Sequence, residues 1–143
     1  MEINMDIINL LNGNFQITEN IIFCKDKNYD DILKLSPKSR TWDVKNGYRW
    51  IYFTDIEIDK LFFHISVCFH NDNLFCIDFG FVQKHEKNLT WDNWNEKDEL
   101  KRKDLYDKWL TKIMGKQRNF DWGKVGAYFD LKSGTSSMYI KYD

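Results

Sequence analysis

The chain has 143 residues and a formal net charge of −1, with 21 basic and 22 acidic side chains. This length is typical of one domain with a single core, and no linker-like stretch interrupts it, so we predict one domain over residues 1–143. The charges are interspersed and form no basic stripe that could neutralise phosphates. We therefore expect no nucleic-acid partner.

Aromatic residues make up 17% of the chain, whereas Ala127 is its single alanine, which favours a bulky, sheet-rich core over a helical bundle. The first residues carry acids where a secretion signal needs positive charge, and no run reaches the roughly 20 apolar residues of a membrane span. The three cysteines have no metal-like spacing. We expect a cytoplasmic protein with reduced thiols and no membrane partner.

The first third of the chain gives weak signals for secondary structure. Asp6 to Leu11 predicts a short helix that ends at an Asn-Gly pair, and Phe15 to Phe23 predicts a strand. Tyr29 to Leu35 predicts a helical turn that ends at Pro37. The pair Asn46-Gly47 is a strong turn signal.

The middle of the chain predicts an antiparallel meander of three strands, Tyr48–Ile58, Leu61–His70 and Leu74–Val82. In the second strand apolar and polar residues alternate, which identifies one face as the core face. The apolar set of that strand comprises Leu61, Phe63, Ile65, Val67 and Phe69. A three-residue loop at 71–73 would pair Phe69 with Phe75 and Val67 with Ile77, and would keep Asp78 out of the core.

A two-residue turn, Asp59-Lys60, would pair Ile58 with Leu61 and Ile56 with Phe63. Continued along the first strand, this register places Trp50 and Tyr52 on the core face. It leaves the apolar Ile51 and Phe53 on the second face, which therefore needs a cover.

The region from Asn95 to Gly115 predicts that cover, an amphipathic helix with Asn95 as N-cap and a glycine at its end. Its apolar stripe consists of Leu105, Tyr106, Trp109, Leu110, Ile113 and Met114. Trp122–Phe129 and Ser137–Tyr142 then predict a closing hairpin. The fold class predicted is α+β, a mostly antiparallel sheet of five or six strands with one main amphipathic helix packed on a face.

One group of residues could carry chemistry. The predicted register sets Cys68 opposite Cys76 and places His64 and Asp78 on the same side of the sheet, where thiolates and an imidazole could hold a metal or a small ligand. However, no Cys-x-x-Cys knuckle is present, and thiols in the middle of a strand are poorly placed for nucleophilic catalysis. We therefore expect a non-enzyme without cofactor or metal, and keep this sheet face as the alternative function.

Acidic and aromatic residues favour protein binding instead. Asp55, Glu57 and Asp59 alternate along a strand and could form an acidic patch for a basic partner, although such acids also keep sheets soluble. Two tryptophans beside an acid precede the long helix and could anchor a partner, although they could equally staple the loop to the core. The partner-binding residues predicted are Asp55, Glu57, Asp59, Trp91, Asp92 and Trp94.

The last 55 or so residues have a pattern of their own, with Trp91-Asp92-Asn93-Trp94, Trp109-Leu110, Gly115, Trp122-Gly123 and the run from Asp130 to Ser137. This pattern resembles small bacterial immunity-like proteins of polymorphic toxin systems. The resemblance implies a cytoplasmic protein that binds and neutralises a cognate toxin, and it transfers no catalytic residue. Acids on the surface would speed association with a basic toxin domain. The oligomeric state is left open.

Overall fold

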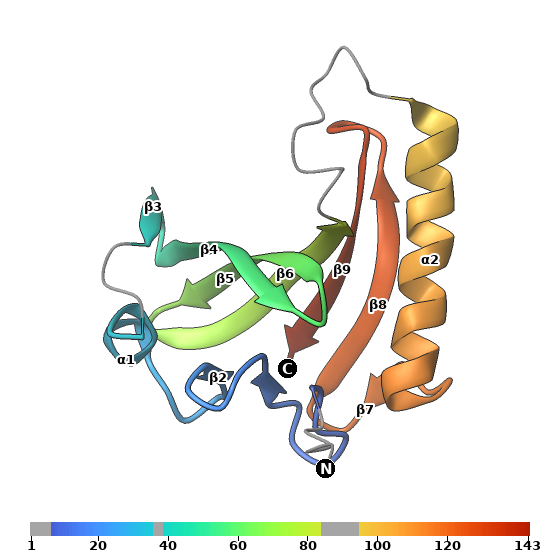
Figure 1. Cartoon of the computed structure of the whole chain (residues 1–143). Coiled ribbons are helices and arrows are strands. Elements are labelled where there is room, and N and C mark those ends of the chain that lie inside the picture. Colours follow the sequence, from blue (N-terminus) through green and yellow to red (C-terminus); the bar gives the residue numbers. More distant parts are fainter. Residues whose placement is uncertain (1–6, 36–38, 84–94) are drawn as a thin grey trace.

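The computed structural model describes residues 7–35, 39–83 and 95–143. Within these residues a seven-stranded antiparallel sheet has the strand order β3-β4-β5-β6-β9-β8-β7, and β1 and β2 form a separate pair (Figure 1). The elements are β1 (Phe15–Gln16), β2 (Ile22–Phe23), α1 (Tyr29–Leu33), β3 (Arg40–Lys45), β4 (Tyr48–Ile58), β5 (Leu61–His70), β6 (Asn73–Gln83), α2 (Glu96–Met114), β7 (Asn119–Phe120), β8 (Gly123–Asp130) and β9 (Thr135–Tyr142). The α+β class, the antiparallel sheet and the single main helix are confirmed, whereas the count of five or six strands was wrong.

The N-terminal predictions need correction. The described part of the expected helix, residues 7–11, is not helical, and residues 15–23 form a tight hairpin of β1 and β2 instead of one strand. The Thr18 hydroxyl causes the reversal, because it accepts from the backbone N–H groups of Asn20 and Ile21 and so competes with an extended conformation. The short helix α1 is confirmed, and Asn28 caps it by accepting from the N–H of Asp31.

The three-strand meander is confirmed, but only one of its two turns gives the predicted pairing of the strands beside it. The Asp59-Lys60 turn pairs Ile58 with Leu61 and Ile56 with Phe63, as predicted. At the other turn, Val67 pairs with Ile77 as predicted, but a bulge next to Cys68 pairs Phe69 with Leu74 instead of Phe75. The turn itself is then two residues long, and both have the positive φ that such turns require.

A second bulge reverses the predicted faces of β4. Phe53 pairs with Ile65 and Ile56 with Phe63, so Thr54 and Asp55 together oppose one residue of β5. One extra residue shifts the alternation by one, because side chains alternate with a period of two. Ile51 and Phe53 are therefore buried in the core, whereas Trp50 and Tyr52 lie on the opposite face. The prediction of the reverse was wrong.

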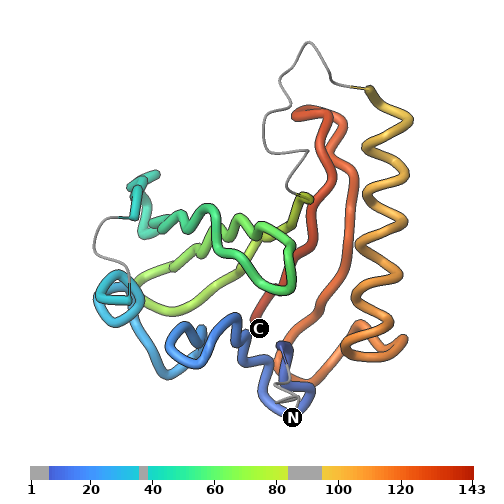
Figure 2. The backbone as a smooth tube through the Cα atoms, viewed as in Figure 1, coloured from blue at the N-terminus to red at the C-terminus, as the bar shows by residue number. Residues whose placement is uncertain are grey.

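Helix α2 begins at the predicted N-cap, where the Asn95 side chain accepts from the N–H groups of Lys97 and Asp98, and ends at Gly115 with a positive φ. It runs beside β8 and β9 along their length (Figure 2). Tyr106, Leu110 and Met114 are buried, whereas Leu105 at the margin of the stripe is 47% exposed.

The helix covers the same face as the N-terminal segment, which corrects its expected place on the second face. Trp109 of α2 contacts Phe63, Phe79 and Phe81, and Phe15 of β1 packs on Phe79. The four phenylalanines belong to one cluster of buried residues, and the partly buried Trp109 packs against it. A face already filled with Phe and Ile side chains offers the larger apolar area, so it attracts both covers.

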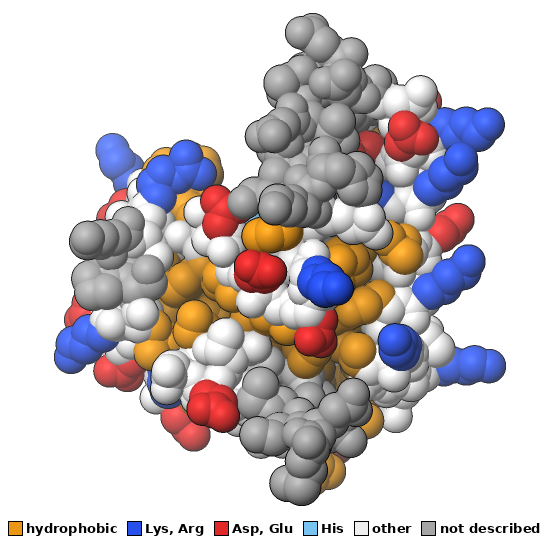
Figure 3. Space-filling view, in the orientation of Figure 1, with side chains coloured by type: hydrophobic (Ala, Val, Ile, Leu, Met, Phe, Trp, Pro, Cys, Tyr) orange, Lys and Arg blue, Asp and Glu red, His pale blue; other side chains and the backbone are white. Residues whose placement is uncertain are grey.

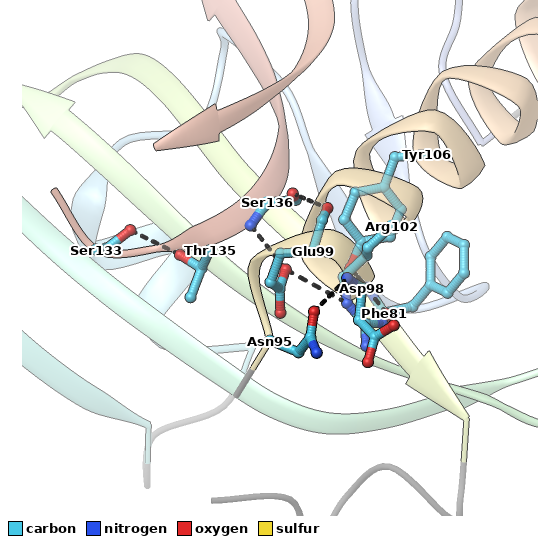
Figure 4. Close-up of polar contacts among 9 residues, drawn as sticks. All are labelled: Phe81, Asn95, Asp98, Glu99, Arg102, Tyr106, Ser133, Thr135 and Ser136. Atoms are coloured by element: carbon cyan, nitrogen blue, oxygen red, sulfur yellow. Dashed lines mark hydrogen bonds and ion pairs between the residues drawn. The ribbon is translucent and has the colours of Figure 1, made fainter. Parts of the chain in front are cut away.

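The pairing of β6 with β9 stops halfway, and side chains of α2 occupy the opening. The last pair is Phe79 with Met138, so two residues further along Phe81 would face Ser136. Instead, the Tyr106 hydroxyl accepts from the N–H of Phe81 at 3.1 Å and donates to its carbonyl at 2.9 Å. On the other strand, the Glu99 carboxylate accepts from the N–H of Ser136 at 3.1 Å (Figure 4). We call this junction of Phe81, Ser136, Glu99 and Tyr106 the seam.

The hydrogen bonds at the seam predict that removing the single hydroxyl group of Tyr106 lowers the stability of the fold. Tyr106→Phe leaves a buried N–H and carbonyl of Phe81 without the hydroxyl, which should lower the free energy of unfolding by roughly 1–3 kcal/mol. Urea denaturation measures this loss. Tyr139→Phe, on the half-buried Tyr139, is the matched control and should cost less. Equal stability of the two variants would contradict the role of the seam.

Candidate functional site

The three acids of β4 and its turn are exposed, as a partner-binding role requires, but local geometry also explains two of them. Asp55 lies in the bulge with a φ of 57° and Asp59 in the turn with a φ of 50°, and aspartate adopts this left-handed region more readily than most residues. Glu57 pairs with Phe62, on the face opposite α2. In the view of Figure 3, acidic side chains stand beside hydrophobic ones that remain visible at the surface.

The second predicted group, Trp91, Asp92 and Trp94, lies outside the described residues. Its role as a partner anchor stays a prediction.

The sheet face opposite α2 includes Cys68, Cys76 and Asp78 of the predicted alternative site, and the structure extends it to β3 and β4, an extension that the sequence did not predict. Strand registers align two rows of side chains across it. We call these two rows the open face: Trp42, Trp50, Cys68, Cys76 and Lys141 in the first, and Arg40, Tyr52, Ser66, Asp78 and Tyr139 in the second. Helix α2 and the N-terminal segment pack on the other face, and no described helix covers this one.

The β3–β4 end of the open face is aromatic and exposed. All six residues of β3 are exposed, and Trp42 is 57% exposed although it pairs directly with Trp50. The rings of Trp50 and Tyr52 are nearly parallel, 7° apart in orientation, with centroids at 6.3 Å. The Arg40 guanidinium lies 5.1 Å from the Tyr52 ring centroid. Large rings held in fixed positions at the surface can bind a partner at low entropic cost.

The residues proposed for the alternative function are partly brought together. Cys68 and Cys76 are direct cross-strand partners, Ser66 faces Asp78, and His64 faces Gly80, as the predicted register requires. Nevertheless, among the described residues no three His, Cys, Asp or Glu side chains are grouped so that they could hold a metal ion. Asp78 is engaged elsewhere, since it accepts from the Tyr128 hydroxyl at 2.5 Å.

His64 belongs to a different feature, a cavity of about 270 Å³ at the seam. The cavity is lined by His64, Val82, Glu99, Arg102, Tyr106, Thr135, Ser136 and Ser137. Glu99 and Arg102 form an ion pair with Nε and Oε2 3.6 Å apart, and their side chains are 18% and 15% exposed. Desolvation by the surrounding protein and the charge of Arg102 lower the pKa of His64, which favours a neutral imidazole at pH 7.

Gly80 lets these groups converge. A Cβ at this position would lie 2.7 Å from the Tyr106 hydroxyl and 2.9 Å from His64 Nε2. The side chains of Tyr106 and His64 therefore both lie close to the backbone of β6 at Gly80, where no side chain is in the way. The Tyr106 hydroxyl can thus approach the backbone closely enough for its two hydrogen bonds to Phe81.

Comparisons of the chain with models of known protein families, with curated proteins and with solved structures found no match. Neither α1 nor α2, the helices of the described ranges, combines the length and the apolarity that a membrane-spanning helix needs. The candidate site therefore stands on its geometry alone.

The environment of Asp78 predicts a pH dependence. Burial raises the pKa of this carboxyl above its ordinary value, although hydrogen bonds from Tyr128 and Ser137 oppose the shift. A carboxyl that holds its proton more tightly when folded contributes stability below its unfolded pKa of about 4, and this contribution is lost as the pH rises through the folded pKa. Asp78→Asn, which mimics the protonated form, should therefore become more stable relative to the wild type as the pH rises.

Urea unfolding of both proteins at several pH values between about 3.5 and 7 tests this expectation. Glu57→Gln, which removes one negative charge from an exposed position, controls for the change in net charge. If the free energy of unfolding of Asp78→Asn fell relative to that of the wild type as the pH rises, the raised pKa would be contradicted.

Proposed function

We propose that this chain is a non-catalytic protein-binding module that binds its partner on the open face. The observation that carries the proposal is the exposure of Trp42, at 57%, beside the ordered rings of Trp50 and Tyr52. A sheet with its core on one side normally exposes polar residues on the other. Here the exposed side carries aromatic rings at one end.

The composition of this surface matches that of protein interfaces. Binding energy at interfaces is concentrated in Trp, Tyr and Arg, which bury large areas while keeping a polar end. Trp42, Tyr52 and Arg40 supply these three types within one contiguous group. Lys141 and Asp78 provide charges further along the rows, as in the polar rim that surrounds such a group.

The partner that we propose is a bacterial toxin, which would make this chain a cytoplasmic immunity protein. Support comes from the resemblance of the last 55 or so residues to immunity-like proteins and from the exposed acids. Glu57 lies on the same side of β4 as Tyr52, beyond the bulge, with Asp55 and Asp59 next to it in sequence. Acids in this position would attract a basic toxin domain and accelerate its association.

A comparison of affinity baits tests the docking surface. Wild-type protein, Trp42→Ala and a control variant, Leu131→Ala, are used to capture proteins from the native bacterium, and mass spectrometry identifies what is retained. Leu131 is 83% exposed in the β8–β9 turn, so its loss also removes one exposed apolar side chain. A partner retained by the wild type and by Leu131→Ala, but depleted from Trp42→Ala, would support the proposal.

Affinity measurements on the purified partner then separate the two parts of the surface. Trp42→Ala should weaken the Kd roughly tenfold or more, the effect of a central aromatic anchor. Asp55→Asn combined with Glu57→Lys should chiefly slow association and reduce its dependence on salt. An unchanged Kd for Trp42→Ala would exclude the open face, and an unchanged association rate would exclude the acids.

The toxin hypothesis has its own test. Expression of the partner alone should arrest growth of a bacterial host, and co-expression of this chain should restore it. A partner that binds through Trp42 but is harmless when expressed alone would leave the binding module intact and reject the immunity role.

The seam cavity supports a second candidate, binding of a small ligand. At about 270 Å³ it lies just below the 300 Å³ or so at which ligand pockets usually begin. This alternative keeps His64 of the predicted group and replaces the cysteines and Asp78 by the Glu99–Arg102 pair. A thermal-shift screen of small polar metabolites tests it, and His64→Asn should abolish any shift that arises at the seam.

A further inference from the structure

Two thiols face each other at the centre of the open face. Cys68 of β5 and Cys76 of β6 are direct cross-strand partners, between Trp50 on one side and Lys141 on the other. Directly opposed residues of antiparallel strands have Cα atoms about 4.5 to 5.5 Å apart. Disulfides span Cα distances of about 4.4 to 6.8 Å, so the two sulfurs could be joined without large backbone movement.

The two thiols differ in access. Cys68 is 2% exposed, whereas Cys76 is partly exposed, and all three cysteines of the chain are free thiols. A small oxidant in solution therefore reaches Cys76 first. The ammonium of Lys141 lowers the pKa of Cys76, but the hydrogen bond with Cys68 and burial outweigh it and raise that pKa overall.

The neighbouring thiols also shift each other's pKa in opposite directions. The hydrogen bond from Cys76 lowers the pKa of Cys68, and the same hydrogen bond, together with burial, raises the pKa of Cys76. The pair thus loses its first proton more readily than an isolated thiol and holds the second more tightly. One thiolate, stabilised by its neighbour, is the nucleophile of thiol–disulfide exchange.

We propose that Cys68 and Cys76 are a redox-active dithiol that a low-molecular-weight disulfide, such as oxidised glutathione, converts into a cross-strand disulfide. Cys68, the thiolate of the pair, accepts the proton of Cys76, and the more accessible Cys76 sulfur attacks one sulfur of glutathione disulfide to form a mixed disulfide. The glutathione thiolate that is released takes the proton from Cys68. The Cys68 thiolate then attacks the Cys76 sulfur and releases the second glutathione. Two protein thiols are oxidised, one glutathione disulfide is reduced to two thiols, and the protons of the dithiol pass to the glutathiones.

This inference is independent of the proposed docking function, because the pairing of β5 with β6 and the exposure of the two thiols do not involve a protein partner. Its site is nevertheless part of the same surface, since Trp50 is the direct cross-strand partner of Cys68. Reversible disulfides of this kind, rather than permanent ones, are those found in reducing compartments.

Differential alkylation of the full chain in glutathione buffers tests the proposal. No Lys or Arg lies between Lys60 and Lys84, so one tryptic peptide carries both thiols, while Cys24 lies in another. As the buffer becomes more oxidising, the peptide with both thiols should pass from two alkyl labels to none and lose two hydrogens in mass. The protein should stay monomeric on a non-reducing gel, with Cys24 still available for labelling under conditions that close the pair.

Single substitutions resolve the order of attack. Cys68→Ser should accumulate glutathione on Cys76, and Cys76→Ser should leave Cys68 reacting about tenfold more slowly, because its sulfur is buried. Cys24→Ser is the matched control and should close the disulfide as the wild type does. The proposal would be overturned if Cys68 and Cys76 both still took up alkyl labels in a buffer oxidising enough to glutathionylate Cys24. It would also be overturned if glutathione stayed attached to the wild-type pair. The wild-type result decides even if a variant fails to fold.

Discussion

The structure depends on how the seam is closed. Where β6 and β9 part, two buried backbone edges lose their ladder partners, and unpaired buried peptide groups cost free energy comparable to a lost hydrogen bond. Side chains of helix α2 replace the missing partners. The Tyr106 hydroxyl hydrogen-bonds to both the N–H and the carbonyl of Phe81, and the Glu99 carboxylate accepts from the N–H of Ser136. The Ser136 hydroxyl returns a bond to the Glu99 carbonyl at 2.5 Å. Helix α2 thereby joins the β3–β6 part of the sheet to the β7–β9 part through polar contacts as well as through its apolar stripe.

Closing the sheet in this way determines which face is left for function. Because α2 and the N-terminal segment both pack on the Phe-rich side, neither covers the side that carries Trp42, Trp50 and Tyr52. The β4 bulge is equally necessary, since without the extra residue the same two rings of β4 would point into the core. Bulges are common beside functional sites because they redirect side chains, and Asp55 performs this function here with a φ of 57°.

The proposed functions place different demands on one surface. Protein docking uses the exposed rings at the β3–β4 edge, and thiol oxidation uses the pair at the centre of the rows. The pair is partly shielded, since Cys68 is buried although the described helices lie on the other face. A thiol buried under neighbouring side chains reacts slowly with large molecules, which restricts the chemistry to small oxidants and to its partner across the strand.

The sequence by itself determined the local elements: the capped helix after Asn95, the hairpin at Asp59-Lys60 and the pairing of Cys68 with Cys76, because caps, turns and alternation act over a few residues. It also contained a signal for β3 that the prediction missed, the alternating residues from Arg40 to Lys45 before the Asn46-Gly47 turn. The tertiary structure alone decided the bulges, the face that α2 covers and the seam. These features depend on contacts between segments far apart in sequence. A local sequence pattern does not show how burial and hydrogen bonding balance in such contacts.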